Sequence, residues 1–215
     1  MNGLPTVRVP RVASTWGNEA DLAALSWAQA VLISPFILAD GSGPAQQATE
    51  ARLCYHEQAL FLRFDCTDRD IWWHHTERDS AIYDEEVVEL FIGAGEVTPI
   101  DYYEFEVSPA GTLLDLTVHS PNSDRTGLIA NFSWDCPGIR WQAGHDQSRN
   151  HWWAVMVIPW ASLGVNAPLP KVWRANLYRI ERPRDASPEF SCWSSTLTDP
   201  ADFHRPERFG VLELA

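Results

Sequence analysis

Short runs in which apolar residues alternate with polar ones, or follow one another directly, recur along the chain. Each run is bounded by Gly, Pro, Asn or Asp, a pattern typical of β-strands closed by turns. The expected strands are 6–9, 31–39, 50–55, 59–66, 86–93, 102–108, 112–118, 138–144, 151–159, 172–181, 190–195 and 210–214. Only 20–28 and 159–164 have the pattern of short helices. The sequence therefore predicts an all-β fold, an antiparallel β-sandwich of the jelly-roll or immunoglobulin-like kind, with about ten strands and one or two short helices.

The same kind of pattern continues over the whole length of 215 residues. There is no internal repeat, no low-complexity linker and no break in composition, and the last expected strand runs almost to Ala215. A chain of this length is within the range of one large domain. We expect a single domain over residues 1–215.

One acidic residue lies where an apolar one is expected. Asp84, Glu85 and Glu86 are placed to occupy a solvated turn, but Glu89 lies between Val88 and Leu90 inside an expected buried strand. A short connection joins this strand to 102–108, so the simplest arrangement is a hairpin.

The strand 102–108 alternates in a way that bears on Glu89. Tyr103, Phe105 and Val107 face one side, while Tyr102, Glu104 and Glu106 face the other. The hairpin then places Glu89 nearly opposite Glu106. Two like charges on a half-buried surface require a cation, a proton or a ligand between them.

The charge of the chain limits its partners. The formal net charge is −13, which argues against nucleic acid or an anionic membrane as the main partner. No stretch has the length of about 18 apolar residues that a membrane helix needs. The N-terminal residues MNGLPTVRVPRV contain no apolar leader segment, so we expect a cytoplasmic protein. Composition favours a neutral ligand or a cation as the partner.

The sequence contains only weak indications of a metal site or of disulfide bonds. Cys54, Cys66, Cys136 and Cys192 are widely spaced without a C-x-x-C pattern, which predicts reduced, buried thiols. His74 and His75 are adjacent and diverge in an extended segment, so they are poor ligands for a common ion. We expect no cofactor. A structural calcium ion in one of two acidic loops stays open as an alternative: Asp65, Asp68 and Asp70, or Asp84, Glu85 and Glu86.

Six segments, in order, give the chain a family resemblance. They are DRDIW (68–72), IYDEEVVELFIG (82–93), YYEFEVSPAGTLLD (102–115), VIPWASLG (157–164), WRANLYRIER (173–182), and CWSST (192–196) followed by FHRPERFG (203–210). Together they resemble the family 9 carbohydrate-binding modules, and more closely the stand-alone family 9-like proteins within the wider DOMON-like group. The resemblance implies a β-sandwich that binds carbohydrate without catalysis.

The resemblance also implies a ligand site. Members of the family hold a terminal sugar between two aromatic rings, while carboxylate, Arg and Asn side chains bind its hydroxyls. By position, one wall falls at Tyr83, the carboxylate at Glu89 and the second wall at Phe203 or His204. Trp193 and Asn176 lie in strands that would form the floor.

The chain differs from the sugar-binding members at two places. Tyr83 stands where they commonly have Trp, and Glu106 stands where they use Arg, although two carboxylates supply only acceptors. Arg179 or Arg63 is the expected source of the missing positive charge. Trp72, or its neighbour Trp73, is a further candidate for the slot, whereas Trp152 and Trp153 fit the core.

Two other functions remain open. Glu89, Glu104 and Glu106 offer an acid and a base for a glycoside-processing enzyme, with one pKa raised by like-charge crowding. Some DOMON-like domains bind haem through Met and His, but Met156 lies in an apolar run that fits core packing. The oligomeric state is not predicted.

Overall fold

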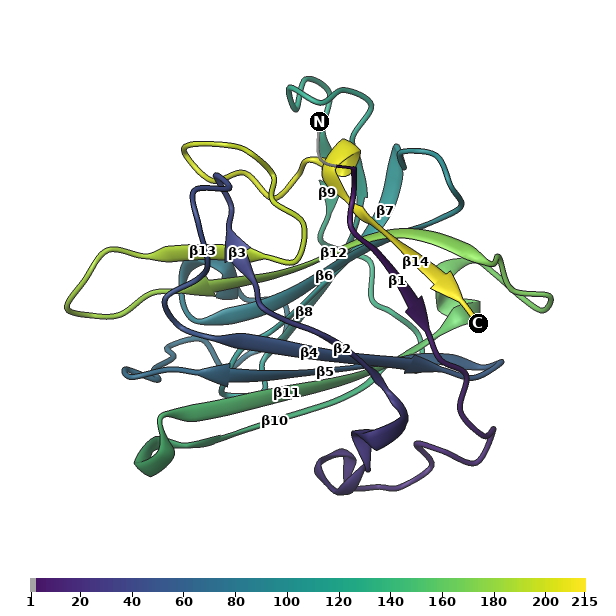
Figure 1. Ribbon diagram of the computed structural model, residues 1–215, viewed down its shortest axis with the longest axis horizontal. Helices are drawn as coiled ribbons and strands as arrows, with labels where there is room; N and C mark the ends of the chain where they lie inside the picture. Colours follow the sequence, from purple (N-terminus) through teal and green to yellow (C-terminus); the bar gives the residue numbers. More distant parts are fainter. Residues whose placement is uncertain (1–2) are drawn as a thin grey trace.

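The computed structural model describes residues 3–215, which form two β-sheets (Figure 1). The larger sheet has nine strands and the smaller has five. In the larger sheet the path is β1 (Thr6–Val9), β14 (Gly210–Leu214), β12 (Val172–Glu181), β6 (Val87–Ala94), β7 (Asp101–Val107), β8 (Leu113–His119) and β9 (Ile129–Asn131), with β13 (Glu189–Cys192) beside β12 and β3 (Ile37–Leu38) beside β13. The smaller sheet has the order β10 (Arg140–Asp146), β11 (His151–Pro159), β5 (Ala59–Thr67), β4 (Thr49–Tyr55) and β2 (Val31–Ile33). The predicted β-sandwich is confirmed.

The details differ from the expected strand list in three places. The run 31–39 divides into β2 and β3 because Pro35, which has no N–H for a ladder, interrupts it. β9 was not expected, since its three residues are largely exposed and carry no apolar alternation. β1 pairs with β14 in parallel, so the larger sheet is not wholly antiparallel.

Among residues 3–215, helical structure is limited to single turns of 3-10 helix. The expected helix at 20–28 consists of η1 (Leu22–Ala24) and η2 (Trp27–Gln29), and the one at 159–164 is η5 (Trp160–Leu163). The other turns are η3 (Ile82–Asp84), η4 (Gln147–Arg149) and η6 (Pro206–Arg208). None of the helices in the described range 3–215 has the length and apolar character to cross a membrane.

The main core lies between the two sheets. Alternate residues of the central strands point into it, such as Leu90 of β6, Phe105 of β7 and Leu62 of β5. Trp152 and Met156 of β11 are fully buried there, as the sequence predicted. The four cysteines are buried and free, which confirms the expectation of unbridged thiols.

A second apolar cluster covers the outer face of the larger sheet. It contains Phe91 of β6, Tyr102 of β7 and Tyr178 of β12, packed with Phe203 and Phe209 from the C-terminal connection. A sheet face in contact with water would carry polar residues at these positions. The segment that leads from β13 to β14 therefore closes over the outer face and gives it a partly enclosed surface (Figure 1).

Candidate functional site

Three glutamates come together on the outer face of the larger sheet. In the β6–β7 hairpin Glu89 pairs directly with Glu106, which confirms the predicted register. Glu104 lies in β7, two residues before Glu106. The side-chain period of two places all three on the same face. One carboxylate oxygen from each lies within 4.8 Å of the other two.

These carboxyls are buried, and among the described residues no Arg or Lys forms an ion pair with them, although the charge of Arg125 partly lowers the pKa of Glu104. Glu89 is 2% exposed, Glu104 6% and Glu106 1%. Burial raises the pKa of Glu104 to about 7. Burial and the carboxyl of Glu104 raise the pKa of Glu89, and burial with both neighbours raises the pKa of Glu106 well above the usual range. The cluster therefore holds protons at neutral pH unless a cation replaces them.

A pocket of about 470 Å³ lies directly above the glutamates. Of the residues that the family resemblance assigned, Tyr83, Glu89, Glu106, Phe203 and His204 line it. Tyr83, in η3, is 38% exposed and presents an aromatic wall. The five residues that the resemblance put in one slot thus surround one concavity, as the site hypothesis requires.

The part of the pocket wall that Phe203 and His204 form is fixed by polar and aromatic contacts. The ring of Phe203 stacks on Tyr178 at 4.2 Å, and the Tyr178 hydroxyl donates to the Phe203 carbonyl at 2.9 Å. His204 Nδ1 lies 2.7 Å from the Tyr102 hydroxyl, and the His204 ring packs against Phe91. Burial, and then the charge of Arg125, lower the pKa of His204 to about 4, so this ring is neutral at physiological pH.

Two arginines at the rim were missed by the sequence analysis. Arg125 comes from the loop before β9 and binds Asp202 at 3.2 Å, which ties that loop to the C-terminal wall. Arg182 follows β12 and donates to the Tyr83 carbonyl at 3.3 Å, while its buried Nε has no hydrogen-bond partner among the described residues. Both lie in irregular segments, where spacing carries no information about which surface a side chain reaches.

Three predicted ligand residues lie away from the pocket. Asn176 is fully buried, and its amide donates to the Ser194 carbonyl and accepts from the Ser194 and Leu177 N–H groups, so it holds the chain after β13 against β12. Trp193 packs against Gly210 and the inter-sheet core. Trp72 donates its indole N–H to the Arg182 carbonyl at 2.5 Å. They serve the scaffold around the site and do not line it.

Arg179 lies on the wrong side of the sheet for the predicted role. Its partner in β6 is Val88, which faces the inter-sheet core, whereas Tyr178 pairs with Glu89. Its guanidinium binds Asp68 at 3.0 Å and lies 3.8 Å from Glu86. The expectation that Arg179 compensates Glu106 is wrong because adjacent strand residues face opposite sides of the sheet.

The other candidate for that charge, Arg63, belongs to the smaller sheet. Arg63 binds Asp65 at 2.7 Å and lies over the ring of Trp153. It belongs to β5 of the smaller sheet, whereas the glutamates lie on the larger one. Arg63 is likewise not the counter-charge of the glutamate cluster.

The acidic turn before β6 is not solvated as expected. Glu85 is 1% exposed and accepts from the N–H groups of His74 and His75. Glu86 is fully buried and accepts from the Arg182 N–H at 2.5 Å. Of the three acidic residues only Asp84 is exposed, so they do not converge on a calcium ion in this turn.

The other proposed acidic loop is also divided among different partners. Asp65 binds Arg63 and Arg52, Asp68 binds Arg179, and Asp70 binds Arg184. Each carboxylate has its own guanidinium, which leaves this loop without a shared oxygen site.

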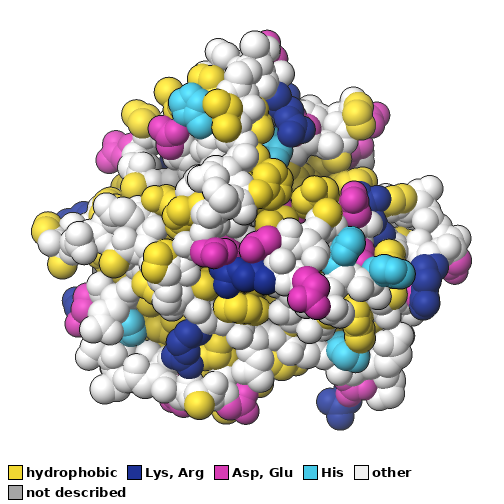
Figure 2. Space-filling view, turned by 180° about the vertical axis from the view of Figure 1, so that it is seen from behind, with side chains coloured by type: hydrophobic (Ala, Val, Ile, Leu, Met, Phe, Trp, Pro, Cys, Tyr) yellow, Lys and Arg dark blue, Asp and Glu magenta, His cyan; other side chains and the backbone are white. Residues whose placement is uncertain are grey.

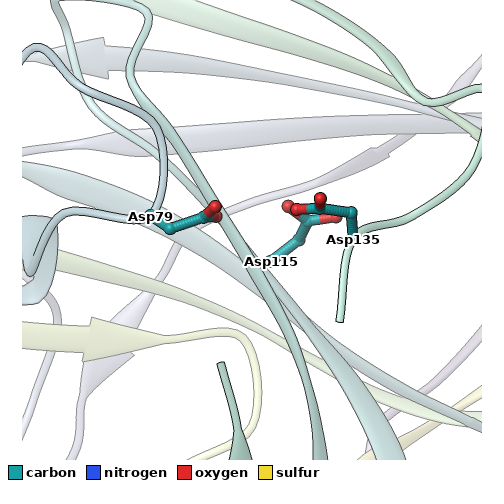
Figure 3. Close-up of side chains that lie close together, drawn as sticks. All are labelled: Asp79, Asp115 and Asp135. Carbon is teal, nitrogen blue, oxygen red and sulfur yellow. The ribbon is translucent and has the colours of Figure 1, made fainter. Parts of the chain in front are cut away.

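A second acidic cluster lies elsewhere on the larger sheet. The carboxylates of Asp79, Asp115 and Asp135 approach one another (Figure 3). Arg78 lies among them, 2.6 Å from Asp115, 3.1 Å from Asp135 and 3.6 Å from Asp79. The buried Asp115 also accepts from the Cys136 N–H at 2.6 Å. Arg78 thus lies within ion-pair distance of all three aspartates, whereas no arginine contacts the three glutamates in this way.

Charges on the visible surface are mixed. On the face in Figure 2, basic side chains lie singly and next to acidic ones, without a continuous basic patch among the described residues. These mixed charges accompany a formal net charge of −13 for the chain.

The fold and the pocket define a β-sandwich of the ligand-binding class, with its candidate site on the outer face of one sheet. Residues 42–214 match the model of carbohydrate-binding family 9, and the chain belongs to this family. The resemblance noted in the sequence is thereby confirmed.

Solved structures support the same fold. A candidate carbohydrate-binding protein from Bacteroides uniformis has a TM-score of 0.77 at 18% identity, over 99% of this chain and all of its own. A family 9 carbohydrate-binding module from Caldicellulosiruptor kristjanssonii has a TM-score of 0.63 in complex with cellotriose, at 13% identity over 98% of this chain and 93% of its own. Its complex with glucose gives the same TM-score at 12% identity. At these identities the likeness concerns the fold.

A curated relative corrects one expectation. A protein of Arthroderma benhamiae named "Extracellular protein" is 30% identical over 167 residues, which is 73% of each chain. Its name contradicts the cytoplasmic location expected from the N-terminal residues. The folded domain does not encode its compartment, because targeting segments are read separately and contribute nothing to the packing of the sandwich.

Proposed function

We propose that the protein binds a sugar ring in the pocket above Glu89, Glu104 and Glu106 and does not cleave it. The observation that carries this proposal is the convergence of an aromatic wall at Tyr83 with buried carboxyl oxygens on one floor. Apolar C–H groups of a pyranose pack on an aromatic face, while fixed polar groups select its hydroxyls.

The rim supplies hydrogen-bond donors that remain charged at neutral pH. Ionised carboxylates only accept hydrogen bonds, whereas guanidinium groups only donate. Arg125 and Arg182 both line the pocket, so their guanidinium groups are the nearest donors to a hydroxyl bound there. Other members of the family have an Arg in the strand where this chain has Glu106. Here Arg125 and Arg182, from irregular segments, supply the donors in its place.

The arrangement of the carboxyls favours binding over hydrolysis. Glycoside hydrolases hold two carboxyls about 5–10 Å apart on either side of the scissile bond. Here the three carboxyls project from one sheet face, with oxygens within 4.8 Å of one another. All of them meet the same side of a ligand. We expect no release of nitrophenol from chromogenic glycosides, and hydrolysis that Glu89→Gln abolishes would contradict the non-catalytic function.

Calorimetry with monosaccharides and disaccharides, in buffer that contains calcium, tests the binding function. We expect a dissociation constant on the order of 10–1000 μM for at least one sugar, because a pocket for one or two rings buries little area. Tyr83→Ala removes the stacking face and is expected to weaken binding about tenfold.

Ile100→Ala is the matched control, since Ile100 is 50% exposed and lies outside the pocket. Absence of binding across the panel by the folded wild-type protein would contradict the proposal. Equal losses in Tyr83→Ala and Ile100→Ala would place the sugar elsewhere.

A further inference from the structure

The glutamate cluster brings three carboxyl groups together without a matching cation from the protein. Within 4.0 Å of its oxygens the described residues place one basic nitrogen, His204 Nδ1, at 4.0 Å from Glu104 Oε2. That nitrogen is engaged by the Tyr102 hydroxyl at 2.7 Å. Arg125 binds Asp202, and Arg182 donates to the Tyr83 carbonyl. Each of these basic groups therefore has a partner outside the glutamate cluster, and none pairs with it closely.

Two of the cluster's oxygens are buried and unsatisfied. Glu104 Oε2 and Glu106 Oε2 have no hydrogen-bond partner among the described residues, and both side chains are more than nine-tenths buried. A buried oxygen without a partner costs about 1–3 kcal/mol, and more when it is charged. The carboxyl groups of Glu104 and Glu106 are close enough to share a proton in a hydrogen bond, and a cation can take the place of that proton.

The geometry of the cluster matches a small cation. Calcium binds oxygen ligands at about 2.3–2.6 Å, so two ligand oxygens of one ion are separated by at most about 5.2 Å. One oxygen each from Glu89, Glu104 and Glu106 meets this limit, being within 4.8 Å of the others. All three side chains rise from the same sheet face, which leaves the side of the ion toward the pocket open.

The donor set selects the kind of ion. Every candidate ligand atom is a carboxylate oxygen, which suits a hard cation such as calcium and not zinc. Magnesium demands a nearly ideal octahedron, whereas calcium accepts irregular coordination by six to eight oxygens. Three carboxylates on one side and exchangeable oxygens on the other fit calcium best.

We propose that Glu89, Glu104 and Glu106 bind a calcium ion at the floor of the pocket, and that hydroxyl oxygens of the bound sugar complete its coordination. The second part rests on the proposed sugar-binding function. The first part concerns the protein and calcium alone. Because Glu106 stands where sugar-binding members of the family have Arg, the pocket floor has more hydrogen-bond acceptors than donors. A calcium ion bound by these acceptors can in turn bind the hydroxyl oxygens of a sugar.

The first experiment measures calcium binding without sugar. Protein freed of metal by a chelator and then dialysed is titrated with calcium chloride in a calorimeter. We expect one ion per chain, a rise in melting temperature with calcium, and at least about tenfold weaker binding in Glu106→Gln. Glutamine preserves the shape of the side chain, and Glu104→Gln gives a second variant if Glu106→Gln does not fold.

Asp135→Asn is the matched control because it makes the same acid-to-amide change in the other acidic cluster, where Arg78 contacts the carboxylates. Calcium binding that this control retains and Glu106→Gln weakens supports the site. No calcium binding by the wild-type protein, or binding lost in Asp135→Asn and kept in Glu106→Gln, overturns it.

The second experiment repeats the sugar titration with calcium and with chelator. Sugar binding that needs calcium supports the bridging role. Equal sugar binding in both conditions overturns the bridging and leaves the proposed function intact. Calcium binding without sugar binding in either condition overturns the proposed function and keeps the ion site. In the presence of chelator, the protein could bind glucosamine more tightly than glucose. That result would mean that an ammonium group occupies the cluster, and it would overturn the calcium site.

Discussion

Buried carboxyls occur on both faces of the larger sheet, with opposite surroundings. On the inner face Asp68 binds Arg179, which also donates to the Thr67 carbonyl, and Trp152 donates to Asp68 at 3.2 Å. Glu86 lies beside them, and burial, with the negative charge of Asp68, raises its pKa to about 9. One guanidinium, one carboxylate and one protonated carboxyl give this group no net charge.

The outer face has no such compensation. Glu89 lies only three residues after Glu86, yet its neighbours are two more glutamates and a neutral histidine. A carboxyl group with an arginine is part of the scaffold, whereas carboxyls without one remain sensitive to protons, cations and ligands. The comparison separates structural acidic residues from those that belong to a site.

The largest expected effect is on the inner face. Arg179→Ala leaves Asp68 buried without its partner, and we expect a loss of about 3–5 kcal/mol in the free energy of unfolding. Urea denaturation measures it. The folded fraction should bind sugar with unchanged affinity, because Arg179 faces away from the pocket. If Arg179→Ala were stable but bound sugar more weakly, Arg179 would belong to the binding site and not to the scaffold.

The second effect is a pH dependence of the metal-free protein. The folded-state pKa of Glu104, raised to about 7, exceeds the unfolded value of 4.5. The folded state therefore retains a proton that the unfolded chain releases, so stability is full below pH 4.5 and falls as pH rises through 7.

We expect the free energy of unfolding to fall by about 3 kcal/mol between pH 4.5 and 7 from this carboxyl group. Denaturation at a series of pH values, in chelator, measures the slope. Glu104→Gln should make the profile less steep, while the raised pKa values of Glu86, Glu89 and Glu106 keep the remaining slope. A profile that rises with pH, or one that the variant leaves unchanged, would show that the cluster is ionised and compensated in the folded state.

A smaller effect is expected at the contact that fixes the C-terminal wall. Tyr102→Phe removes the hydroxyl next to His204 Nδ1 and retains the ring that packs with Phe209. The expected cost is about 1 kcal/mol of stability, with a modest loss of sugar affinity because His204 is less well held. Thermal unfolding and calorimetry measure the two. A gain in affinity would mean that the hydroxyl restrains the wall in an unfavourable position.

The smallest effect is expected in the cluster of Figure 3. Asp135 is 66% exposed and shares Arg78 with the buried Asp115, so Asp135→Asn should change the free energy of unfolding by no more than about 0.5 kcal/mol. Urea denaturation again measures the change. A loss of several kcal/mol would show that this cluster depends on all three carboxylates, and would weaken the contrast with the glutamates.

The sequence by itself determined the architecture and the centre of the candidate site. Alternation along 102–107 specified which residues of β7 share a face, and a short connection between two strands implied the hairpin that pairs Glu89 with Glu106. These are local properties, because the side-chain period of a strand and the length of a turn are set by neighbouring residues. The aromatic wall at Tyr83 and the pair Phe203–His204 followed from the family resemblance.

Only the tertiary structure decided where the positive charges lie. The register between β12 and β6 places Arg179 opposite Val88, and a shift of one residue would have turned it toward Glu89. Arg125 and Arg182 reach the rim from irregular segments whose paths depend on packing over the outer face. Contacts across the whole fold determine which distant strands pair and which paths the loops take. A local sequence pattern therefore does not predict them.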